Sequence, residues 1–382
     1  MSSLRPYIAI NATALFKKNK TGVEWYSWQL LKYLSKEWKE SDPPVVLFAP
    51  RDSVETGHAP SLHARKKNWY PKPLKGKYFW TQYHLLRFLH QYPPVLLFSP
   101  SYVAPLFLNK NIPKLTVVHG LEGEYYPEVN SIKNILLEHF IYTPALRKST
   151  HILAVSEHTK KDLHHFYNIP LSRIDTVLSG PGTLDDDYTP RPALAGHPSQ
   201  EGIKFLFIGG VNERKNLEMA LRIFHSLKKQ TKKNINLFIA GNLKKPNPII
   251  KKLIRKGGKN IIRLGYISEK EKKKQLLSAL FLFYPSFYEG FGFPVLEAQA
   301  FGVVPIVLKN SGLAEIGGEG IIELDPSSKN KFLAIELAKV INNPLKYHEL
   351  QEFGLDNVKR FSWQKCAKAT RKLILKTLIN SN

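Results

Sequence analysis

Residues 284–302 read Y-P-S-F-Y-E-G-F-G-F-P-V-L-E-A-Q-A-F-G, and the rest of the chain is best understood outward from them. The apolar run Ala279 to Tyr284 predicts a buried strand, which the following Pro-Ser pair ends. Gly290 and Gly292 predict a turn, and a helix resumes from about Pro294, since proline is tolerated in the first turn of a helix. A strand, a glycine-rich loop and a helix start bring backbone N–H groups and the positive end of a helix dipole together. The stretch therefore predicts a phosphate-binding site.

Two carboxylates bracket this turn, Glu289 before it and Glu297 inside the expected helix. A carboxylate repels phosphate, but it accepts hydrogen bonds from hydroxyl groups, as an acidic residue does with ribose in dinucleotide-binding folds. Donors for a diphosphate beside acceptors for two sets of hydroxyls indicate a nucleotide-sugar. The alternative is a buried strand, turn and helix carrying two solvated glutamates.

The segment E-G-F-G-F-P-V-L-E, residues 289–297, resembles the E-x7-E motif of the retaining glycosyltransferases of family 4, which have the GT-B fold. The likeness continues through P-S-F-Y before it and A-Q-A-F-G-V-V-P-I-V after it, and this length disfavours the structural alternative. The resemblance implies that Glu297 binds ribose hydroxyls and that Glu289 acts at the sugar ring. It also implies donor contacts from three residues of the turn: Gly290, Phe291 and Gly292.

The whole chain has 382 residues, 43% of them hydrophobic, which suits two globular domains with a core each. No run of about 18 apolar residues occurs, so no membrane-spanning helix is expected. The N-terminus has too short an apolar stretch for a secretory signal. Cys366 is the single cysteine, which excludes a disulfide framework and a cysteine metal site and fits a reducing cytoplasm.

The formal net charge of +25 requires an anionic partner or surface. Nucleic acid, anionic lipid headgroups and a diphosphate substrate are the three candidates, and the lysines between 228 and 274 can also form a solvated face. Residues 65–80 interleave six cations with five aromatic residues and no acid, which suits a membrane interface. We expect Lys66, Lys67 and Trp69 to contact a membrane or an acceptor there. Stacked bases would need the same residue types, but no nucleic-acid-binding motif supports that reading.

The N-terminal part predicts a buried strand at 6–11 and a helix starting near Gly22. The T-G-V turn at 21–23 resembles the opening of the family, in which this glycine approaches the donor diphosphate. Glu24 and Trp25 depart from the small or basic residues that are usual there, which affects nearby acceptor contacts.

His119 ends an apolar run, Lys114 to Gly120, at the expected carboxyl end of a parallel strand, where open α/β sheets bind ligands. A core or capping histidine is the alternative. The segment V-V-H-G-L-E-G-E resembles the family's histidine strand, which implies that His119 lies near the donor sugar and β-phosphate. Gly120 replaces the aspartate often found there, and Glu122 and Glu124 are candidates for contacting an acceptor hydroxyl.

A second strand, glycine-rich loop and helix start occurs at 204–217, with Arg214 and Lys215 in its loop. Cations beside backbone donors suit a diphosphate, although a solvated basic loop is the alternative. The stretch resembles the family's G-x-x-x-x-R-K-N element, which implies that Lys215 holds the diphosphate, with Arg214 second. The family resemblance implies that the nucleotide base lies near the end of the strand expected at 260–267, so Tyr266 or Ile267 is a candidate base contact.

Strands alternate with helices throughout, which predicts an α/β protein of two doubly wound parallel-sheet, Rossmann-like domains. By resemblance this is the GT-B fold, with the domains facing a cleft and a C-terminal helix crossing back to the first domain. We expect an N-terminal acceptor domain at 1–182, a linker at 183–202, a nucleotide-sugar domain at 203–362 and the crossing helix at 363–382. Ser156 predicts an N-cap for a helix at 157–167.

The resemblance implies a metal-independent enzyme without a cofactor, because cationic side chains and backbone N–H groups stabilise the departing diphosphate and no metal-like D-x-D motif occurs. It would transfer a sugar with retention from a nucleotide-sugar, GDP-mannose first and a UDP-sugar second. The expected acceptor is a hydroxyl of a glycan or of a lipid-diphosphate-linked glycan in surface polysaccharide synthesis. The expected location is the cytoplasm, peripherally on the inner face of the membrane, with no nucleic acid bound. The rivals are an epimerase or hydrolase on the same fold, and a non-catalytic basic binding protein.

Overall fold

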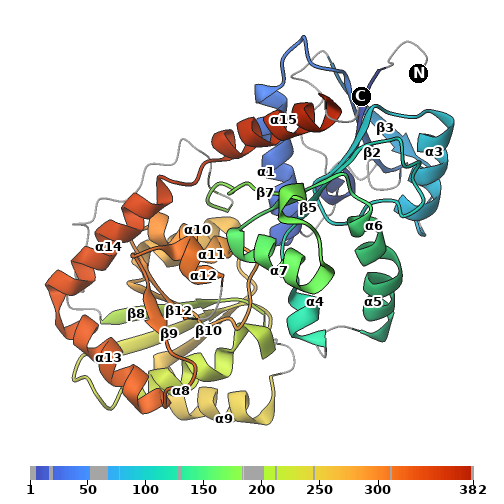
Figure 1. Ribbon diagram of the computed structural model, residues 1–382. Helices are drawn as coiled ribbons and strands as arrows, with labels where there is room; N and C mark the ends of the chain where they lie inside the picture. Colours follow the sequence, from blue (N-terminus) through green and yellow to red (C-terminus); the bar gives the residue numbers. More distant parts are fainter. Residues whose placement is uncertain are drawn as a thin grey trace. The chain divides into compact units, whose positions relative to one another are not determined.

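The computed structural model describes residues 6–16, 20–51, 68–76, 78–127, 131–182, 184, 202–210, 213–243, 246–309 and 312–379. The chain divides into two compact units, residues 1–186 with 361–382 and residues 187–360 (Figure 1). We call them the first and the second unit. Most of the expected linker, residues 183 and 185–201, lies outside the described residues, and the expected boundaries stay a prediction.

The first unit contains a seven-stranded parallel sheet in the order β3-β2-β1-β4-β5-β6-β7. Its strands are β1 Ile8–Asn11, β2 Val45–Pro50, β3 Trp69–Leu74, β4 Leu96–Ser99, β5 Lys114–Val118, β6 His151–Ala154 and β7 Ile174–Thr176. The order changes direction between β1 and β4, and ligands of open α/β sheets bind outside the carboxyl ends of the strands at such a point. The loops that follow β1, β4 and β5 are therefore placed to bind a ligand.

The edge strand β3 lies in the stretch interpreted from sequence as a basic and aromatic surface. It contains Pro71 and Pro73, residues that normally argue against a strand. Both are tolerated because, among the described strands, β3 pairs with β2 alone, so its other edge needs no N–H donors. The pairing buries the first residue of β3: Trp69 is 3% exposed and its ring meets Trp38 edge-on at 6.2 Å between centroids.

Two helices of the first unit begin at the residues that the sequence predicts. Helix α1 begins at Gly22, and α7 begins after Ser156, whose hydroxyl accepts the N–H of Thr159 at 3.1 Å, so the expected N-cap is confirmed. The α-helices are α1 Gly22–Glu37, α3 Leu86–Gln91, α4 Glu122–Tyr125, α5 Ile132–Leu137, α6 Thr143–Arg147, α7 Glu157–Tyr167 and α15 Trp363–Ile379. Shorter helical segments are η2 Thr13–Phe16, η4 Thr81–Leu85, η6 Glu138–Tyr142 and η7 Leu171–Arg173.

The C-terminal helix α15 packs on α1, as expected (Figure 1). Trp363 is fully buried at its start, meets the ring of Tyr26 at 5.6 Å and donates from Nε1 to the carbonyl of Gly182 at 3.1 Å. Further along, Arg371 forms a two-pronged ion pair with the buried carboxylate of Asp42 at 2.7 and 2.5 Å. These contacts anchor the C-terminal helix α15 in the first unit.

The second unit contains a six-stranded parallel sheet in the order β10-β9-β8-β11-β12-β13. Its strands are β8 Ile203–Ile208, β9 Ile235–Ala240, β10 Ile261–Gly265, β11 Phe281–Tyr284, β12 Val304–Leu308 and β13 Ile322–Leu324. The ring of Phe205 stacks on Phe281 and Phe283 in the core, at 5.0 and 5.1 Å. The direction of the order changes between β8 and β11, so the loops after these two strands flank the expected ligand position.

Seven α-helices connect these strands and extend from them within the described part of the second unit. They are α8 Leu217–Leu227, α9 Pro248–Gly257, α10 Glu269–Ser278, α11 Phe293–Ala300, α12 Leu313–Gly317, α13 Asn330–Asn342 and α14 Pro344–Val358, with short helical segments η8 Glu213–Lys215 and η9 Gly258–Asn260. Across both units, none of the helices in the described residues has the length and apolarity needed to span a bilayer.

Candidate active site

The two loops at the switch point of the second unit meet through charged side chains. Oε1 of Glu289, after β11, lies 2.5 Å from Nζ of Lys215 and 2.7 Å from Nη1 of Arg214, which both follow β8. Arg214 also donates to the carbonyl of Tyr288 at 2.7 Å, and Lys215 to the hydroxyl of Tyr284. The three ionic side chains are only 12–15% exposed. Sequence-distant residues thus form one cluster with a single excess positive charge.

The cluster keeps its carboxylate ionised. Burial would raise the pKa of Glu289, but Lys215 and Arg214 outweigh it and hold that pKa below its ordinary value. Burial raises the pKa of Tyr284 well above its ordinary value, with the Glu289 charge adding to it. The Tyr284 hydroxyl therefore stays neutral beside the two charges.

Helix α11 starts at this cluster, as the sequence predicts. Its N-cap Gly292 has a φ of 101°, a conformation that favours glycine, and a Cβ there would lie 2.3 Å from Leu313. Pro294 stands in the first turn. Gly290 and Phe291 are buried between Glu289 and the cap, the latter with its ring 5.3 Å from that of Phe293. The geometry suits the proposed phosphate contacts of this turn, which stay a prediction.

Glu297 forms an ion pair with a lysine of another helix, which the sequence did not predict. It is 2% exposed on α11, and its two carboxylate oxygens lie 3.0 and 2.9 Å from Nζ of Lys272 on α10. Lys272 also bridges to Glu269 at 2.7 Å. Burial alone would lower the pKa of Lys272, but Glu297 and Glu269 raise it. A carboxylate has about four lone-pair sites, so Glu297 can accept further hydrogen bonds from hydroxyls.

The predicted base contact, Tyr266, follows β10 directly and is 87% exposed. Its ring is thus available at the carboxyl end of the sheet, but no hydrogen bond or ring contact with the described residues of the unit is seen for it.

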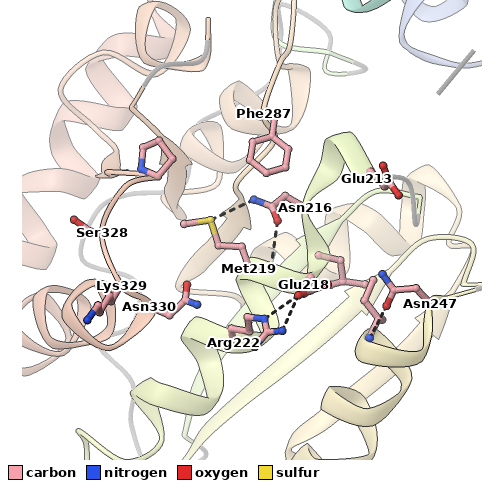
Figure 2. Close-up of a pocket in the computed structure, with 13 residues that line it drawn as sticks. Glu213, Asn216, Glu218, Met219, Arg222, Asn247, Phe287, Ser328, Lys329 and Asn330 are labelled. Carbon is pink, nitrogen blue, oxygen red and sulfur yellow. Dashed lines mark hydrogen bonds and ion pairs between the residues drawn. The ribbon is translucent and has the colours of Figure 1, made fainter. Parts of the chain in front are cut away.

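A pocket of about 650 Å³ in the second unit is lined in part by Glu213, Asn216 and Phe287 (Figure 2). The backbone joins it to the cluster, since Phe287 in its wall donates its N–H to the carbonyl of Arg214 at 2.9 Å. Glu218 pairs with Arg222 at 2.8 Å across its floor, and Asn216 caps α8 by accepting the N–H of Met219. Glu218, Arg222 and Asn216 are therefore paired within the protein.

In the first unit, His119 directly follows β5. Its Nε2 lies 2.9 Å from the carbonyl oxygen of Pro100, and the ring meets Tyr26 edge-on at 4.6 Å. A carbonyl only accepts, so Nε2 carries the proton and Nδ1 is left as an acceptor. Burial lowers the pKa of His119 to about 4, against smaller raising effects of the Pro100 contact and Glu24. The ring is therefore neutral at pH 7.

We expect a histidine NMR titration to show one ring with a midpoint near pH 4, absent from the spectrum of His119→Gln. The pKa is depressed in the folded state, so the unfolded chain binds more protons as pH falls from about 6.5 toward 4. His119 therefore contributes stability that is lost in that range. A midpoint between 6 and 7 would mean that the ring is solvated and the assigned tautomer is wrong.

Gly22 opens α1 as predicted, and the structure explains Glu24. The Glu24 carboxylate, 5% exposed, accepts the backbone N–H of Thr21 at 2.9 Å and the Thr21 hydroxyl, which is a capping arrangement. The departure from the family pattern at this position thus fixes the start of the helix. The diphosphate contact of Gly22 stays a prediction.

The residues predicted to contact an acceptor or a membrane differ in their exposure. Glu122 and Glu124 are exposed on α4, and Glu124 accepts from the Tyr167 hydroxyl at 2.9 Å. Lys66 and Lys67 lie outside the described residues. The prediction that Trp69 contacts a membrane or an acceptor is wrong, because its side chain is buried in the first unit.

Sequence reasoning missed three supporting residues: Lys272, Tyr284 and Tyr26. Lys272 stands in a lysine-rich run interpreted as a possible solvated face, and only its spacing from Glu269 hints at an ion pair. Among the described residues, no three His, Cys, Asp or Glu side chains gather to hold a metal ion.

Comparisons with known proteins agree with this architecture. The family model "Glycosyltransferase Family 4" matches residues 21–180, and "Glycosyl transferases group 1" matches residues 195–356. O-antigen chain mannosyltransferase B of Escherichia coli is 26% identical over 292 residues, 74% of each chain. Sucrose-phosphate synthase of Thermosynechococcus elongatus has a TM-score of 0.72 at 15% identity, covering 98% of this chain and 100% of that one. HepE of Anabaena, solved with UDP-glucose, has a TM-score of 0.66 at 13% identity, covering 97% and 99%.

Two Rossmann-like parallel-sheet units with this order of motifs define a glycosyltransferase of the GT-B class. The two family matches together cover most of the chain. The chain belongs to glycosyltransferase family 4 and is similar to mannosyltransferases, which confirms the expected family and fold.

Proposed function

We propose that this glycosyltransferase transfers a hexose from a nucleoside diphosphate sugar to a hydroxyl, with retention at the anomeric carbon. Mannose is the first candidate for the hexose. The observation that carries the proposal is the cluster of Lys215, Arg214 and Glu289 at the switch point of the second unit. It offers cations for a diphosphate and a carboxylate for sugar hydroxyls at one place.

The cations serve the leaving group. Breaking the anomeric bond puts negative charge on the β-phosphate, and preorganised positive groups lower the barrier by stabilising it. Lys215 and Arg214 are already oriented by Glu289, and the N-terminus of α11 adds its dipole. Since these groups supply the charge stabilisation, we propose that the reaction needs no metal ion and no cofactor.

Glu289 is suited to positioning the sugar rather than to attacking it. Its Oε1 is bound by two cations, which lower its pKa and its nucleophilicity. This favours attack by the acceptor hydroxyl on the face that the leaving group vacates, without a covalent glycosyl-enzyme.

His119 is proposed to bind a donor-sugar hydroxyl. Its Nδ1 is an acceptor because Nε2–H is engaged with Pro100, and an acceptor cannot donate to a phosphate oxygen. Of the two roles expected from sequence, sugar or phosphate, the tautomer favours the sugar.

The mannosyl donor is supported by the likeness to the Escherichia coli O-antigen enzyme, which makes GDP-mannose the first candidate. The fold-level likeness to HepE with UDP-glucose keeps UDP-sugars second. We propose as acceptor a glycan or a lipid-diphosphate-linked glycan in cell-surface polysaccharide synthesis, reached from the cytoplasmic side of a membrane.

Calorimetry with GDP, UDP and ADP tests the donor site. We expect one nucleotide to bind. Glu297→Ala should weaken its binding by about 1–3 kcal/mol, because the ribose hydroxyls lose the buried carboxylate that accepts their hydrogen bonds. Lys346→Ala, an exposed change on α14, is the control. Binding that is unaffected by Glu297→Ala would remove Glu297 from the ribose site.

A further inference from the structure

The pocket of about 650 Å³ in the second unit has no role in the proposed donor contacts, since none of the described residues that line it is among them. Its volume lies within the range of about 300–1,000 Å³ that is usual for small-molecule sites. Leu217 and Ile250 in its wall are buried, whereas Phe287 is 40% exposed. The pocket therefore offers an accessible aromatic ring beside buried apolar side chains.

Contacts within the protein fix the walls of this pocket. Asn247 caps α9 by accepting the N–H of Ile250 at 2.8 Å, in the same way that Asn216 caps α8. The backbone of Phe287 is held by the carbonyl of Arg214 at 2.9 Å. Because these walls are ordered before a ligand arrives, little conformational entropy is lost on binding. Even a ligand that makes modest contacts is therefore held there.

Several polar side chains of the pocket are suited to hydroxyl groups (Figure 2). Among the described residues, no hydrogen-bond partner is seen for the amide of Asn330 or for the carboxylate of Glu213. The cap of Asn247 uses Oδ1, which leaves the NH₂ of its amide to donate. An amide donates and accepts, and a carboxylate accepts, so these groups complement hydroxyls, which do both.

The charges that line the pocket exclude two other classes of ligand. Two acids, Glu213 and Glu218, balance two cations, Arg222 and Lys329, and Glu218 is paired with Arg222 at 2.8 Å. A phosphate would lie near the Glu213 carboxylate without an excess of positive charge to offset the repulsion. A purely apolar ligand would take water from the amides without replacing its hydrogen bonds, which costs free energy. The favoured ligand is neutral, with an apolar face and several hydroxyls, which is the chemistry of a sugar ring.

We propose that this pocket is a second saccharide site, which binds a neutral sugar unit of a glycan in addition to the donor sugar at the catalytic cluster. The C–H face of the sugar packs on the ring of Phe287. Its hydroxyls hydrogen-bond to the amides of Asn247 and Asn330 and to the carboxylate of Glu213. The use of the site, to retain a glycan on the second unit, rests on the proposed function, whereas sugar binding itself does not.

The two loops that form the catalytic cluster also line the saccharide site. In the loop after β8, Glu213 and Asn216 line the pocket, and Lys215 pairs with Glu289. In the loop after β11, Phe287 lines the pocket and Glu289 belongs to the cluster. A sugar on Phe287 therefore contacts a loop that also carries a residue of the cluster, which keeps the glycan near the place of reaction.

Saturation-transfer difference NMR with methyl α-mannoside and a dimannoside tests sugar binding without requiring catalysis. Asn330→Trp fills the pocket from the first residue of α13, and Asn342→Trp, an exposed change at the last residue of the same helix, is the matched control. We expect wild type and Asn342→Trp to bind with similar, roughly millimolar affinity. Phe287→Ala should bind roughly 5–10-fold more weakly, because the aromatic ring is lost. Asn330→Trp should not bind the sugars.

Lys215→Ala separates the saccharide site from the donor position, because it changes the cluster and leaves the pocket residues in place; it should bind the sugars as wild type does. Three results would overturn the proposal: no sugar binding by wild type, unchanged binding by both Asn330→Trp and Phe287→Ala, or a loss confined to Lys215→Ala. Displacement of the sugar by inorganic phosphate would also overturn it, since the pocket would then be an anion site.

Thermal unfolding of Asn330→Trp and Asn342→Trp checks that both fold, and if Asn330→Trp is destabilised, Phe287→Ala decides the outcome. Calorimetry with nucleotides separates the proposal from the proposed function. Sugar binding that Asn330→Trp abolishes, in a protein that binds no nucleotide, would leave the saccharide site standing while the proposed function failed.

Discussion

Lys215→Ala should lower kcat for sugar transfer by about 10²–10³-fold, the cost of removing one preorganised group from a developing anion. Lys215 contacts Glu289 at 2.5 Å and also the Tyr284 hydroxyl, so its loss leaves the largely buried Glu289 with Arg214 as its remaining cation. The effect should appear mainly in kcat, because negative charge grows on the leaving group in the transition state. Nucleotide binding should weaken less.

Steady-state kinetics with a fixed acceptor measure this change, and Lys228→Ala is the matched control. Lys228 follows α8, is exposed, and donates from Nζ to Oδ1 of Asn260 at 2.6 Å. We expect its activity to be unchanged. If Lys215→Ala retains more than about one third of kcat, the leaving group is stabilised elsewhere.

Trp363→Ala should reduce the unfolding free energy of the first unit by about 3–5 kcal/mol, as for other buried tryptophans. The side chain is fully buried, and a residue with a Cβ in place of Gly180 would meet its ring at 2.4 Å, which shows how closely the chain packs there. Alanine would leave a cavity beside Tyr26 and remove the donor that the Gly182 carbonyl accepts from. The return of the chain to the first unit therefore depends on this residue.

Tryptophan fluorescence during urea unfolding reports on this unit, because all six tryptophans of the chain belong to it. Lys368→Ala, an exposed change on the same helix, should leave the transition within about 0.5 kcal/mol of wild type. A transition of Trp363→Ala that coincides with wild type would show that α15 contributes little to the stability of the unit.

The parts of the structure that local sequence determines were predictable. The N-cap of α7 at Ser156 follows from one hydroxyl before a helical pattern, and the start of α11 follows from glycine and proline at fixed offsets. The family motif also brought Lys215 and Glu289 to one site, although they are distant in the chain and only the sheet order places their loops side by side.

The parts that depend on neighbours in space were not predictable. Trp69 was assigned to a membrane or acceptor surface because cations and aromatic residues interleave at 65–80 without an acid, whereas its place in the edge strand β3 buries its side chain. In the sequence, Lys272 cannot be distinguished from the other lysines of its run. Only the structure shows its ion pair with Glu297 on another helix. The exposed residues Ile132, Leu136 and Phe140 have the apolar spacing of a core helix, and periodicity alone does not distinguish an exposed apolar face from a buried one.

The most direct test of the central claim is sugar transfer from labelled GDP-α-mannose, with labelled UDP-glucose in parallel, to lipid-linked glycans from a membrane extract. We predict that label enters the glycan in an acceptor-dependent way, that the new linkage is α, and that chelator does not prevent it. Lys215→Ala should give almost no product. Label released as free sugar or recovered as an epimerised donor would indicate the rival hydrolase or epimerase, and a β linkage would contradict retention.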